Sequence, residues 1–281
     1  MRWIDIVSGE FEEAVKKSKG VCLLPIGCVE LHGHHLPLGN DTMIAAEFSR
    51  RAAEKEEAVV FPEMYFGEKA GAGEFPGTII FPSDLIQKIL EHCCLEIARN
   101  GFHKILLVNF HGGNVSMLNN FARFMLHQKP NFQIFVYNLP SGKPERLLKN
   151  IEKYPYLTEE DIACLTSYVE EGKMDGHGGF GETSAAMACF PQLCKPEKMN
   201  ELDGTSTRRF AEFDKRKIYT PFAWMGNFPN SLSCSAHEGL SERIIRASGE
   251  YSVDTLAEVI RFLKEEKESE AYLKEWLDKQ A

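Results

Sequence analysis

The sequence predicts a three-layer α/β/α fold, in which helices cover both faces of a mainly parallel central sheet. Two observations support this class. Apolar, strand-like runs alternate with helical patterns along the first half of the chain, and strands joined through helices pair in parallel. The expected strands are Val21–Ile26, Ala58–Phe61, Lys104–Asn109 and Phe132–Tyr137. The expected helices are Asp41–Lys55, Ser83–Asn100 and Asn114–His127.

Local signals mark the ends of these elements. Ser83 and Asp84 are typical residues for a helix start, and Gly101 is typical for a helix end. The polar, basic stretch Lys143–Tyr154 is expected to be a surface excursion. From Ser248 onward, apolar residues recur at helical spacing and predict a closing amphipathic helix, followed by the solvated charge run 264–270.

The composition indicates a globular domain and argues against a nucleic-acid-binding or membrane-spanning protein. The chain has 281 residues with 43% hydrophobic residues, enough for one domain over residues 1–281 with a buried core. Its 32 Lys and Arg against 41 Asp and Glu give a formal charge of −9, which argues against nucleic-acid binding. No run is long enough for a membrane span, and the N-terminus does not resemble a signal peptide.

The eight cysteines favour a reducing, cytoplasmic location. None forms a C-x-x-C pair, and most lie in apolar or helical surroundings, as buried free thiols do. Cys28 borders the segment of greatest interest. As a nucleophile it would need a paired base, whereas as a packing residue it needs none, and packing is favoured.

The most informative segment is Glu30–Asp41, which closely follows the run Val21–Ile26 and holds one Glu, three His and one Asp. Carboxylate and imidazole groups in this mixture suit Zn²⁺, Mn²⁺ or Fe²⁺. Glu30 and His32 are two residues apart, so on an extended segment they point to the same face. Glycine and proline residues then bend the chain and can bring Asp41 to the same point. The alternative is a polar turn, but five potential ligands favour a metal site.

Two later segments supply further candidate ligands. His111 follows the run Lys104–Asn109, and active-site residues of open parallel sheets gather at the carboxyl ends of strands. His177 and Glu182 lie among glycines that allow the backbone to approach a ligand closely. Each also has a structural alternative: His111 can be satisfied within its turn, and Glu182 can be an acid in the first turn of the helix that follows.

Together these motifs resemble the creatininase (creatinine amidohydrolase) family. The order is E-x-H-G-x-H-L-P-x-G-x-D at Glu30–Asp41, N-x-H-G-G-N at Asn109–Asn114 and H-x-G-x-x-E-T-S at His177–Ser184. Gly73–Thr78 resembles the F-P-G-T segment of that family, and Gly226–Gly239 its late glycine and proline loop. The resemblance implies an α/β/α fold with a two-metal hydrolytic site, assembled into hexamers.

Carried over residue by residue, the resemblance implies that Glu30, His32, Asp41 and His111 bind two divalent metal ions, with Asp41 bridging them. Zinc is the favoured ion, with manganese or iron as alternatives. His177 matches the family's histidine near the substrate and has suitable chemistry for proton transfer to a leaving nitrogen. The alternative for His177 is an orienting role.

The chain also departs from the family pattern. Creatininase carries a metal-binding Glu where this chain has Gly113, and Glu182 is the nearest acid by motif that can replace it. His34 and Phe110 stand where many relatives have Pro and Gly. His34 and Trp224 are candidate substrate contacts, although Trp224 could equally belong to the core.

The resulting prediction is a metal-dependent amidohydrolase. It would hydrolyse a C–N bond, of cyclic amide or formamide type, in a small polar substrate through metal-activated water. The alternatives are a metal-dependent hydrolase or lyase of a cyclic keto-sugar and a non-catalytic metal-binding relative. No nucleic-acid or membrane partner is expected, and a homo-oligomer is.

Overall fold

The centre of the fold is a parallel sheet that ends beside a pocket. The computed structural model describes residues 1–69, 71–235 and 239–280, so residues 236–238 of the Gly226–Gly239 segment lie outside the described residues. Within these ranges the sheet has four strands, in the order β2-β1-β3-β4. They are β1 (Val21–Ile26), β2 (Val59–Val60), β3 (Lys104–Asn109) and β4 (Gln133–Asn138). The predicted parallel sheet is confirmed.

The register of the two central strands decides where the site forms. β1 and β3 pair residue for residue, from Val21 opposite Lys104 to Ile26 opposite Asn109. Both strands therefore end at the same level, and the segments that follow them leave the sheet side by side. Residues just after Ile26 and Asn109 are brought together although more than 80 positions separate them in the sequence.

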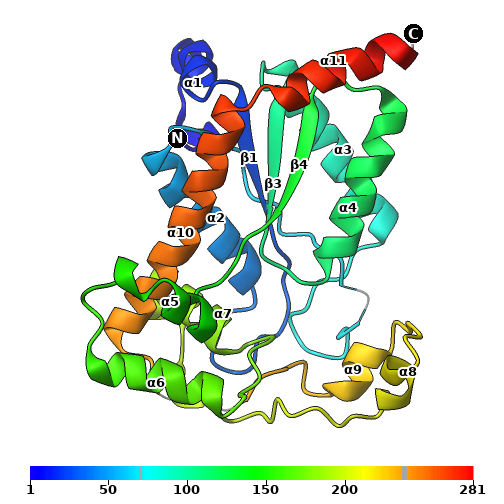
Figure 1. The fold of residues 1–281 in the computed structure, drawn as a ribbon. Coiled ribbons are helices and arrows are strands. Elements are labelled where there is room, and N and C mark those ends of the chain that lie inside the picture. Colours follow the sequence, from blue (N-terminus) through cyan, green and yellow to red (C-terminus); the bar gives the residue numbers. More distant parts are fainter. Residues whose placement is uncertain (70, 236–238, 281) are drawn as a thin grey trace.

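Helices cover both faces of the sheet, as predicted (Figure 1). Helices α2 (Asn40–Lys55), α7 (Phe180–Cys189) and α10 (Glu242–Glu265) pack on one another, and one apolar core lies between them and the sheet. Helices α3 (Ser83–Arg99) and α4 (Asn114–Met125) cover the other face over a second core. The remaining α-helices are α1 (Phe11–Lys17), α5 (Pro144–Lys149), α6 (Glu159–Glu170), α8 (Ala211–Lys215), α9 (Ala223–Asn227) and α11 (Glu268–Gln280). None of the described helices is long and apolar enough to cross a membrane.

One expectation about a polar segment was wrong, and the closing helix starts earlier than expected. The stretch Lys143–Tyr154 is not a surface excursion, because Leu147 and Tyr154 are buried in a third apolar cluster that α5 and α6 form with the start of α10. The predicted amphipathic closing helix is confirmed as α10, although it begins earlier than Ser248. It starts at Glu242, where the Ser241 side chain accepts a hydrogen bond from the backbone of Ile244.

The charge run after α10 is not simply a solvated face. The Lys104 side chain is buried, and its Nζ donates hydrogen bonds to the carbonyl oxygens of Leu263 and Glu266 at 2.7 and 2.8 Å. It also lies 2.8 Å from Glu266 Oε1 and 3.0 Å from Glu270 Oε1. Residues of this run therefore pair with the buried Lys104 ammonium. Without such partners, burial of its charge would cost considerable free energy.

Candidate metal centre

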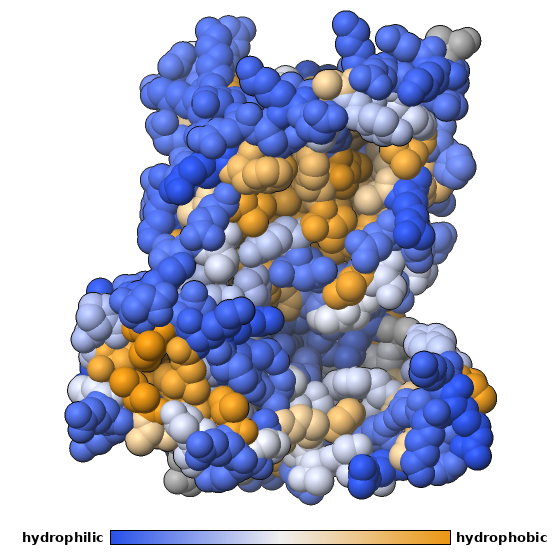
Figure 2. Space-filling model, viewed as in Figure 1, coloured by the Kyte–Doolittle hydropathy of each residue, from blue (hydrophilic) through white to orange (hydrophobic). Residues whose placement is uncertain are grey.

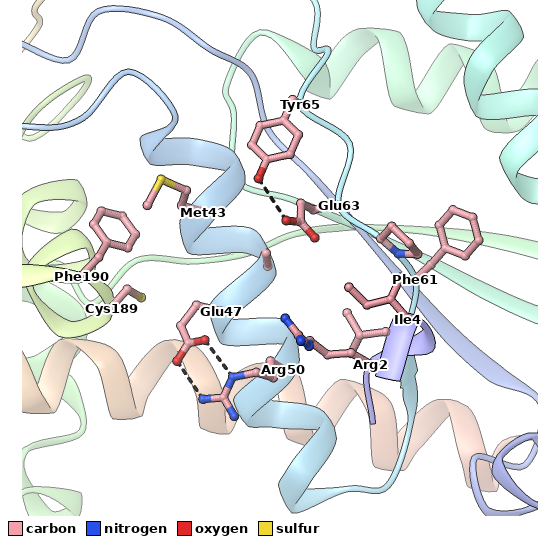
Figure 3. A pocket seen from close by; sticks show the side chains of 13 residues that line it. Arg2, Ile4, Met43, Glu47, Arg50, Phe61, Glu63, Tyr65, Cys189 and Phe190 are labelled. Carbon is pink, nitrogen blue, oxygen red and sulfur yellow. Dashed lines mark hydrogen bonds and ion pairs between the residues drawn. The ribbon is translucent and has the colours of Figure 1, made fainter. Parts of the chain in front are cut away.

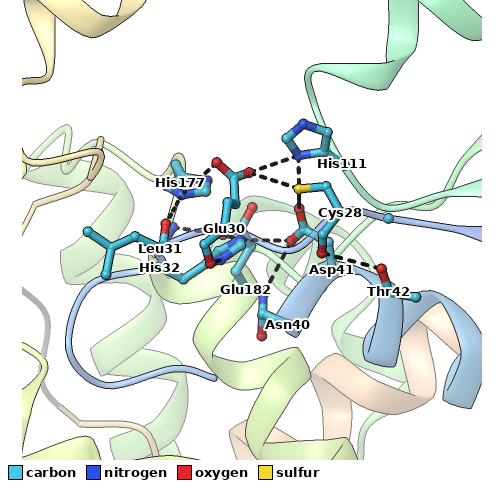
Figure 4. A network of polar contacts seen from close by, with 12 residues as sticks. Cys28, Glu30, Leu31, His32, Asn40, Asp41, Thr42, His111, His177 and Glu182 are labelled. Carbon is cyan, nitrogen blue, oxygen red and sulfur yellow. Dashed lines mark hydrogen bonds and ion pairs between the residues drawn. The ribbon is translucent and has the colours of Figure 1, made fainter. Parts of the chain in front are cut away.

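Five predicted ligand residues meet at the carboxyl ends of β1 and β3. Glu30 and His32 lie on the segment after β1, Asp41 in the first turn of α2, His111 two residues after the end of β3, and Glu182 in the first turn of α7 (Figure 4). The first four are buried, and the Glu182 side chain is partly exposed. A pocket of about 720 Å³ opens beside them, and its lining includes Glu30, His111 and Glu182.

A close approach of α2 to the end of β1 positions Asp41. A Cβ atom on Gly27 would lie 2.2 Å from the backbone nitrogen of Thr42, so only glycine fits at this contact. The Thr42 hydroxyl then donates to the carbonyl oxygen of Cys28 at 3.3 Å. The first turn of α2 is thereby held against the strand end that carries Glu30.

One group of ligand atoms surrounds His111 Nδ1. This nitrogen lies 3.0 Å from Glu30 Oε1 and 2.9 Å from Asp41 Oδ2. The other ring nitrogen, Nε2, lies 3.0 Å from the carbonyl oxygen of Glu68, to which it donates. Burial alone would lower the pKa of His111, but Cys28, Asp41 and Glu30 raise it well above its usual value, so the field at Nδ1 favours a positive charge. A neutral ring with its proton on Nε2 would direct the Nδ1 lone pair at the two carboxylates. A cation between these atoms satisfies all three, so the geometry fits a metal ion.

A second group surrounds His32 Nε2. This nitrogen lies 2.8 Å from Asp41 Oδ1 and 3.7 Å from Glu182 Oε2, while Nδ1 faces the carbonyl oxygen of Glu30 at 3.1 Å. Burial alone would lower the pKa of His32, but three nearby carboxylates, Asp41 first and then Glu182 and Glu30, together outweigh it and raise the pKa to about 9. The field at this nitrogen therefore favours a positive charge. Asp41 turns one oxygen to each group, as a bridging carboxylate does.

Glu182 is the acid that approaches the second group, whereas position 113 has no room for a side chain. Besides approaching His32, Glu182 Oε2 accepts a hydrogen bond from the backbone of Gly178 at 2.7 Å, and burial raises the pKa of Glu182 to about 7. A Cβ atom on Gly113 would lie 2.4 Å from His111 Nε2 and 2.5 Å from the carbonyl oxygen of Glu68. An acid at position 113 is therefore incompatible with the hydrogen bond that orients His111.

His177 lies against the second group. Its ring centroid is 4.1 Å from that of His32, and its Nε2 donates to the carbonyl oxygen of Leu31 at 2.6 Å. Burial, followed by the nearby His32, lowers the pKa of His177 to about 4, so the ring is neutral near pH 7. In this tautomer Nδ1 is the nitrogen that can accept a proton. Trp224 packs edge-on against the ring at 5.6 Å and lines the pocket.

Lys69 was missed by the sequence analysis. Its ammonium forms an ion pair with Glu30 Oε2 and lies 4.6 Å from the centroid of the Trp224 ring, an arrangement typical of a cation–π contact. Its position in a glycine-rich stretch before Gly73–Thr78 is the one signal that the sequence offers. Glu30 therefore faces His111 with one oxygen and Lys69 with the other.

His34 does not join the site. Its side chain is 48% exposed, lies 2.8 Å from Glu201 Oε2, and is not among the residues that line the pocket. The expected substrate contact at His34 is not supported by this position. Cys28, by contrast, is fully buried, and burial together with the Asp41 carboxylate raises the pKa of its thiol well above the usual value. A free thiolate nucleophile is therefore disfavoured.

A smaller pocket of about 250 Å³ lies beside α2, away from these ligands (Figure 3). Several of its polar side chains are paired: the Arg50 guanidinium donates hydrogen bonds to Glu47 at 2.8 Å, and the Tyr65 hydroxyl donates to Glu63 at 3.0 Å. These pairs leave little chemistry for a substrate. The larger pocket is the one whose lining combines histidines with buried carboxylate groups, as metal-dependent active sites do.

Comparison with known sequences identifies relatives of this chain. The sequence model of the creatininase family, described as creatinine amidohydrolase, matches residues 5–259. The chain is 26% identical to creatinine amidohydrolase of Pseudomonas putida over 192 residues, 66% of this chain and 70% of that protein. It is 35% identical to the mycofactocin precursor peptide peptidase of Mycolicibacterium smegmatis over 105 residues, 34% of this chain and 41% of the peptidase. A 3-dehydro-scyllo-inosose hydrolase of Thermotoga maritima is 22% identical over 259 residues, 88% of this chain and 76% of that protein.

Solved structures agree on the fold. A crystal structure of creatinine amidohydrolase superimposes with a TM-score of 0.69 at 20% identity, covering 95% of this chain and 98% of the other. Similar structures include a creatininase variant described as Zn-Zn type, with a TM-score of 0.68 at 21% identity over 94% and 98% of the two chains. Another is described as creatininase Mn, with a TM-score of 0.69 at 20% identity over 94% and 99%.

Proposed function

The chain belongs to the creatinine amidohydrolase family and is a hydrolase, and from this premise we propose that it cleaves a C–N bond through two bound divalent metal ions. The proposed substrate is a small polar molecule with a cyclic amide or formamide group. Zinc is the favoured ion, because thiol, imidazole and carboxylate groups surround the site and because similar creatininases are described as Zn-Zn and Mn forms.

The proposal rests mainly on the way in which the Asp41 carboxylate is shared between two histidines. His111 Nδ1 and His32 Nε2 each face carboxylate oxygens, and the two oxygens of Asp41 divide between them at 2.9 and 2.8 Å. Their other ring nitrogens face backbone carbonyl oxygens, which fixes each ring as metal ligands are commonly fixed. Two cation positions that share one carboxylate are the arrangement a dinuclear hydrolase needs.

In this proposal, different residues of the chain would bind the metal ions, transfer a proton and contact the substrate. Glu30, Asp41 and His111 would hold one ion, and His32, Asp41 and Glu182 the other; bound ions supply an activated water and stabilise negative charge on the carbonyl oxygen. Neutral His177 would accept a proton at Nδ1 and return it to the leaving nitrogen. Trp224 would form a wall for a planar substrate, and Lys69 would hold the outer oxygen of Glu30.

Metal analysis followed by a substrate screen tests this function. The purified protein should carry about two divalent ions and should hydrolyse members of a panel of cyclic amides and formamides. In ¹⁸O-labelled water the acid product should gain one solvent oxygen, because water supplies the group that replaces nitrogen. Turnover that adds no solvent oxygen would exclude hydrolysis and support a lyase.

The keto-sugar alternative is not favoured. The family model that matches describes creatinine amidohydrolases, and the inosose hydrolase is less similar in sequence than the Pseudomonas enzyme. A panel that includes cyclic ketones keeps this alternative measurable. A non-catalytic role is also not favoured, because the chain is a hydrolase by family and has an acid, Glu182, close to His32.

Glu182→Gln should remove about one of the two ions. The substitution keeps the size of the side chain but removes the charge that offsets the repulsion between two dications, and first-shell ligands have strong effects on affinity. Metal content should fall from about two ions to about one, measured after dialysis by mass spectrometry. Glu68→Gln, which alters another acid that lines the pocket, is the matched control and should keep both. An unchanged metal content in the Glu182 variant would contradict the ligand role.

We also propose that the protein is a homo-oligomer, and the family resemblance implies a hexamer. A cytoplasmic location is a separate part of the proposal. β4 is the edge of the sheet and is half-buried, and Figure 2 shows an apolar area over this region of the molecule. Exposed apolar side chains on neighbouring elements include Phe124, Leu126 and Phe262. Sedimentation equilibrium should give a mass several times 31.8 kDa, and a monomer at micromolar concentration would exclude the assembly.

A further inference from the structure

The Cys28 thiol lies inside the first group of ligand atoms. Its Sγ is 3.3 Å from Glu30 Oε1 and 3.4 Å from Asp41 Oδ2, and both oxygens also lie within 3.0 Å of His111 Nδ1 (Figure 4). The residue is fully buried. A thiol has one proton and cannot donate to two carboxylates at once, so one oxygen always faces sulfur without a hydrogen between them.

The distances between these four atoms approach those of a tetrahedral metal site. With zinc–sulfur bonds of about 2.3 Å and zinc–oxygen or zinc–nitrogen bonds of about 2.0 Å, a regular tetrahedron has S···O edges of about 3.5 Å and N···O edges of about 3.3 Å. The S···O edges here are 3.3 and 3.4 Å, and the N···O edges are 3.0 and 2.9 Å. An ion would need to open each of these four edges by no more than a few tenths of an ångström.

The backbone holds the sulfur in this place. Cys28 follows Gly27, whose lack of a side chain lets α2 approach the end of β1, and the Cys28 carbonyl oxygen accepts the hydrogen bond from Thr42 at 3.3 Å. The thiol and the Asp41 carboxylate thus belong to one fixed contact between strand and helix. Preorganised ligands of this kind favour metal binding.

We propose that Cys28 is a thiolate ligand of one metal ion, completing a four-ligand site with Glu30, Asp41 and His111. The inference rests on the proposed metal centre and assigns different roles to its two sites. Four protein ligands close the first site, whereas His32, Asp41 and Glu182 leave an open position at the second, which is where water and substrate would bind. Sulfur also favours zinc or cobalt over manganese at the first site.

Cobalt absorption spectroscopy tests the ligand directly. Protein stripped of metal with a chelator and titrated with Co²⁺ should develop a sulfur-to-cobalt charge-transfer band in the near ultraviolet. Cys28→Ser, which is similar in size, should lose this band while keeping visible cobalt bands from the remaining ligands. It should also reduce the preference of the first site for zinc over manganese by about 10-fold or more. Cys22→Ser is the matched control, because Cys22 is a buried cysteine on β1 that belongs to the second apolar core, away from the ligand group.

Each possible outcome either supports or overturns the assignment of Cys28 as a metal ligand. Visible cobalt bands without a charge-transfer band in the unaltered protein would overturn the sulfur ligand and leave the metal centre intact. A charge-transfer band that survives in Cys28→Ser would also overturn it, by assigning the sulfur to another cysteine. Failure to bind cobalt at all would overturn the metal centre and the ligand with it. If the variant does not fold, X-ray absorption of the zinc-loaded unaltered protein should still give about one sulfur for every two zinc ions, and none would overturn the proposal.

Discussion

Asp41→Asn should abolish turnover and reduce the content of both metal ions. Asp41 directs Oδ2 to His111 and Oδ1 to His32, at 2.9 and 2.8 Å, so one substitution affects both proposed sites. An amide keeps the shape of the side chain but offers one neutral oxygen in place of two charged ones. Since metal ions contribute several kcal/mol to such reactions, kcat/KM should fall by at least about 10³-fold. Metal analysis and steady-state kinetics on the same preparation measure both effects.

Glu30→Gln is the informative comparison for this bridging role. Glu30 contacts His111 at 3.0 Å and belongs to the first group only, so its loss should mainly weaken one ion. Thermal unfolding of all proteins with chelator present separates lost metal binding from lost folding. If the Asp41 variant folds normally and still holds about two ions, the bridging arrangement is wrong.

Much of the proposed ligand set could be predicted because its residues lie in short segments that follow strands. Glu30 and His32 share one short segment, and His111 lies two residues after the strand Lys104–Asn109, whose four central residues are apolar. Parallel pairing of β1 and β3 then brings these residues to one edge without further information. Glu182 needed the family resemblance, because its spacing also suits an ordinary helix start.

Other parts of the site depend on contacts that no local pattern encodes. Lys69 reaches Glu30 from a glycine-rich segment with no periodicity, so its pairing is visible only in three dimensions. The need for glycine at position 113 arises from the Glu68 carbonyl oxygen, 45 residues earlier in the chain. Burial of Lys104 beneath the segment after α10 likewise joins positions about 160 residues apart. In each case the reason for a charged residue or a glycine is a contact with a residue far away in the sequence.

His177→Ala should lower kcat by about 10²–10⁴-fold while leaving both metal ions in place. The His177 ring contacts His32 at 4.1 Å but belongs to neither group around Asp41, so its loss removes a proton carrier and no proposed metal ligand. Because burial lowers the pKa of His177 to about 4, the ring is neutral at pH 7 and its Nδ1 keeps a lone pair. Substrates with better leaving groups should suffer less from the substitution, since they need less help from a proton at the leaving nitrogen.

His177→Gln separates proton transfer from orientation. A glutamine amide can still donate to the Leu31 carbonyl oxygen, which His177 Nε2 now contacts at 2.6 Å, but it cannot shuttle a proton. If proton transfer is the role, the glutamine variant should be about as slow as the alanine variant. Recovery of most of the activity with glutamine, or equal losses for good and poor leaving groups, would show that His177 only orients its surroundings. Full metal content in both variants is the condition under which this comparison is decisive, because a lost ion would lower kcat by a different route.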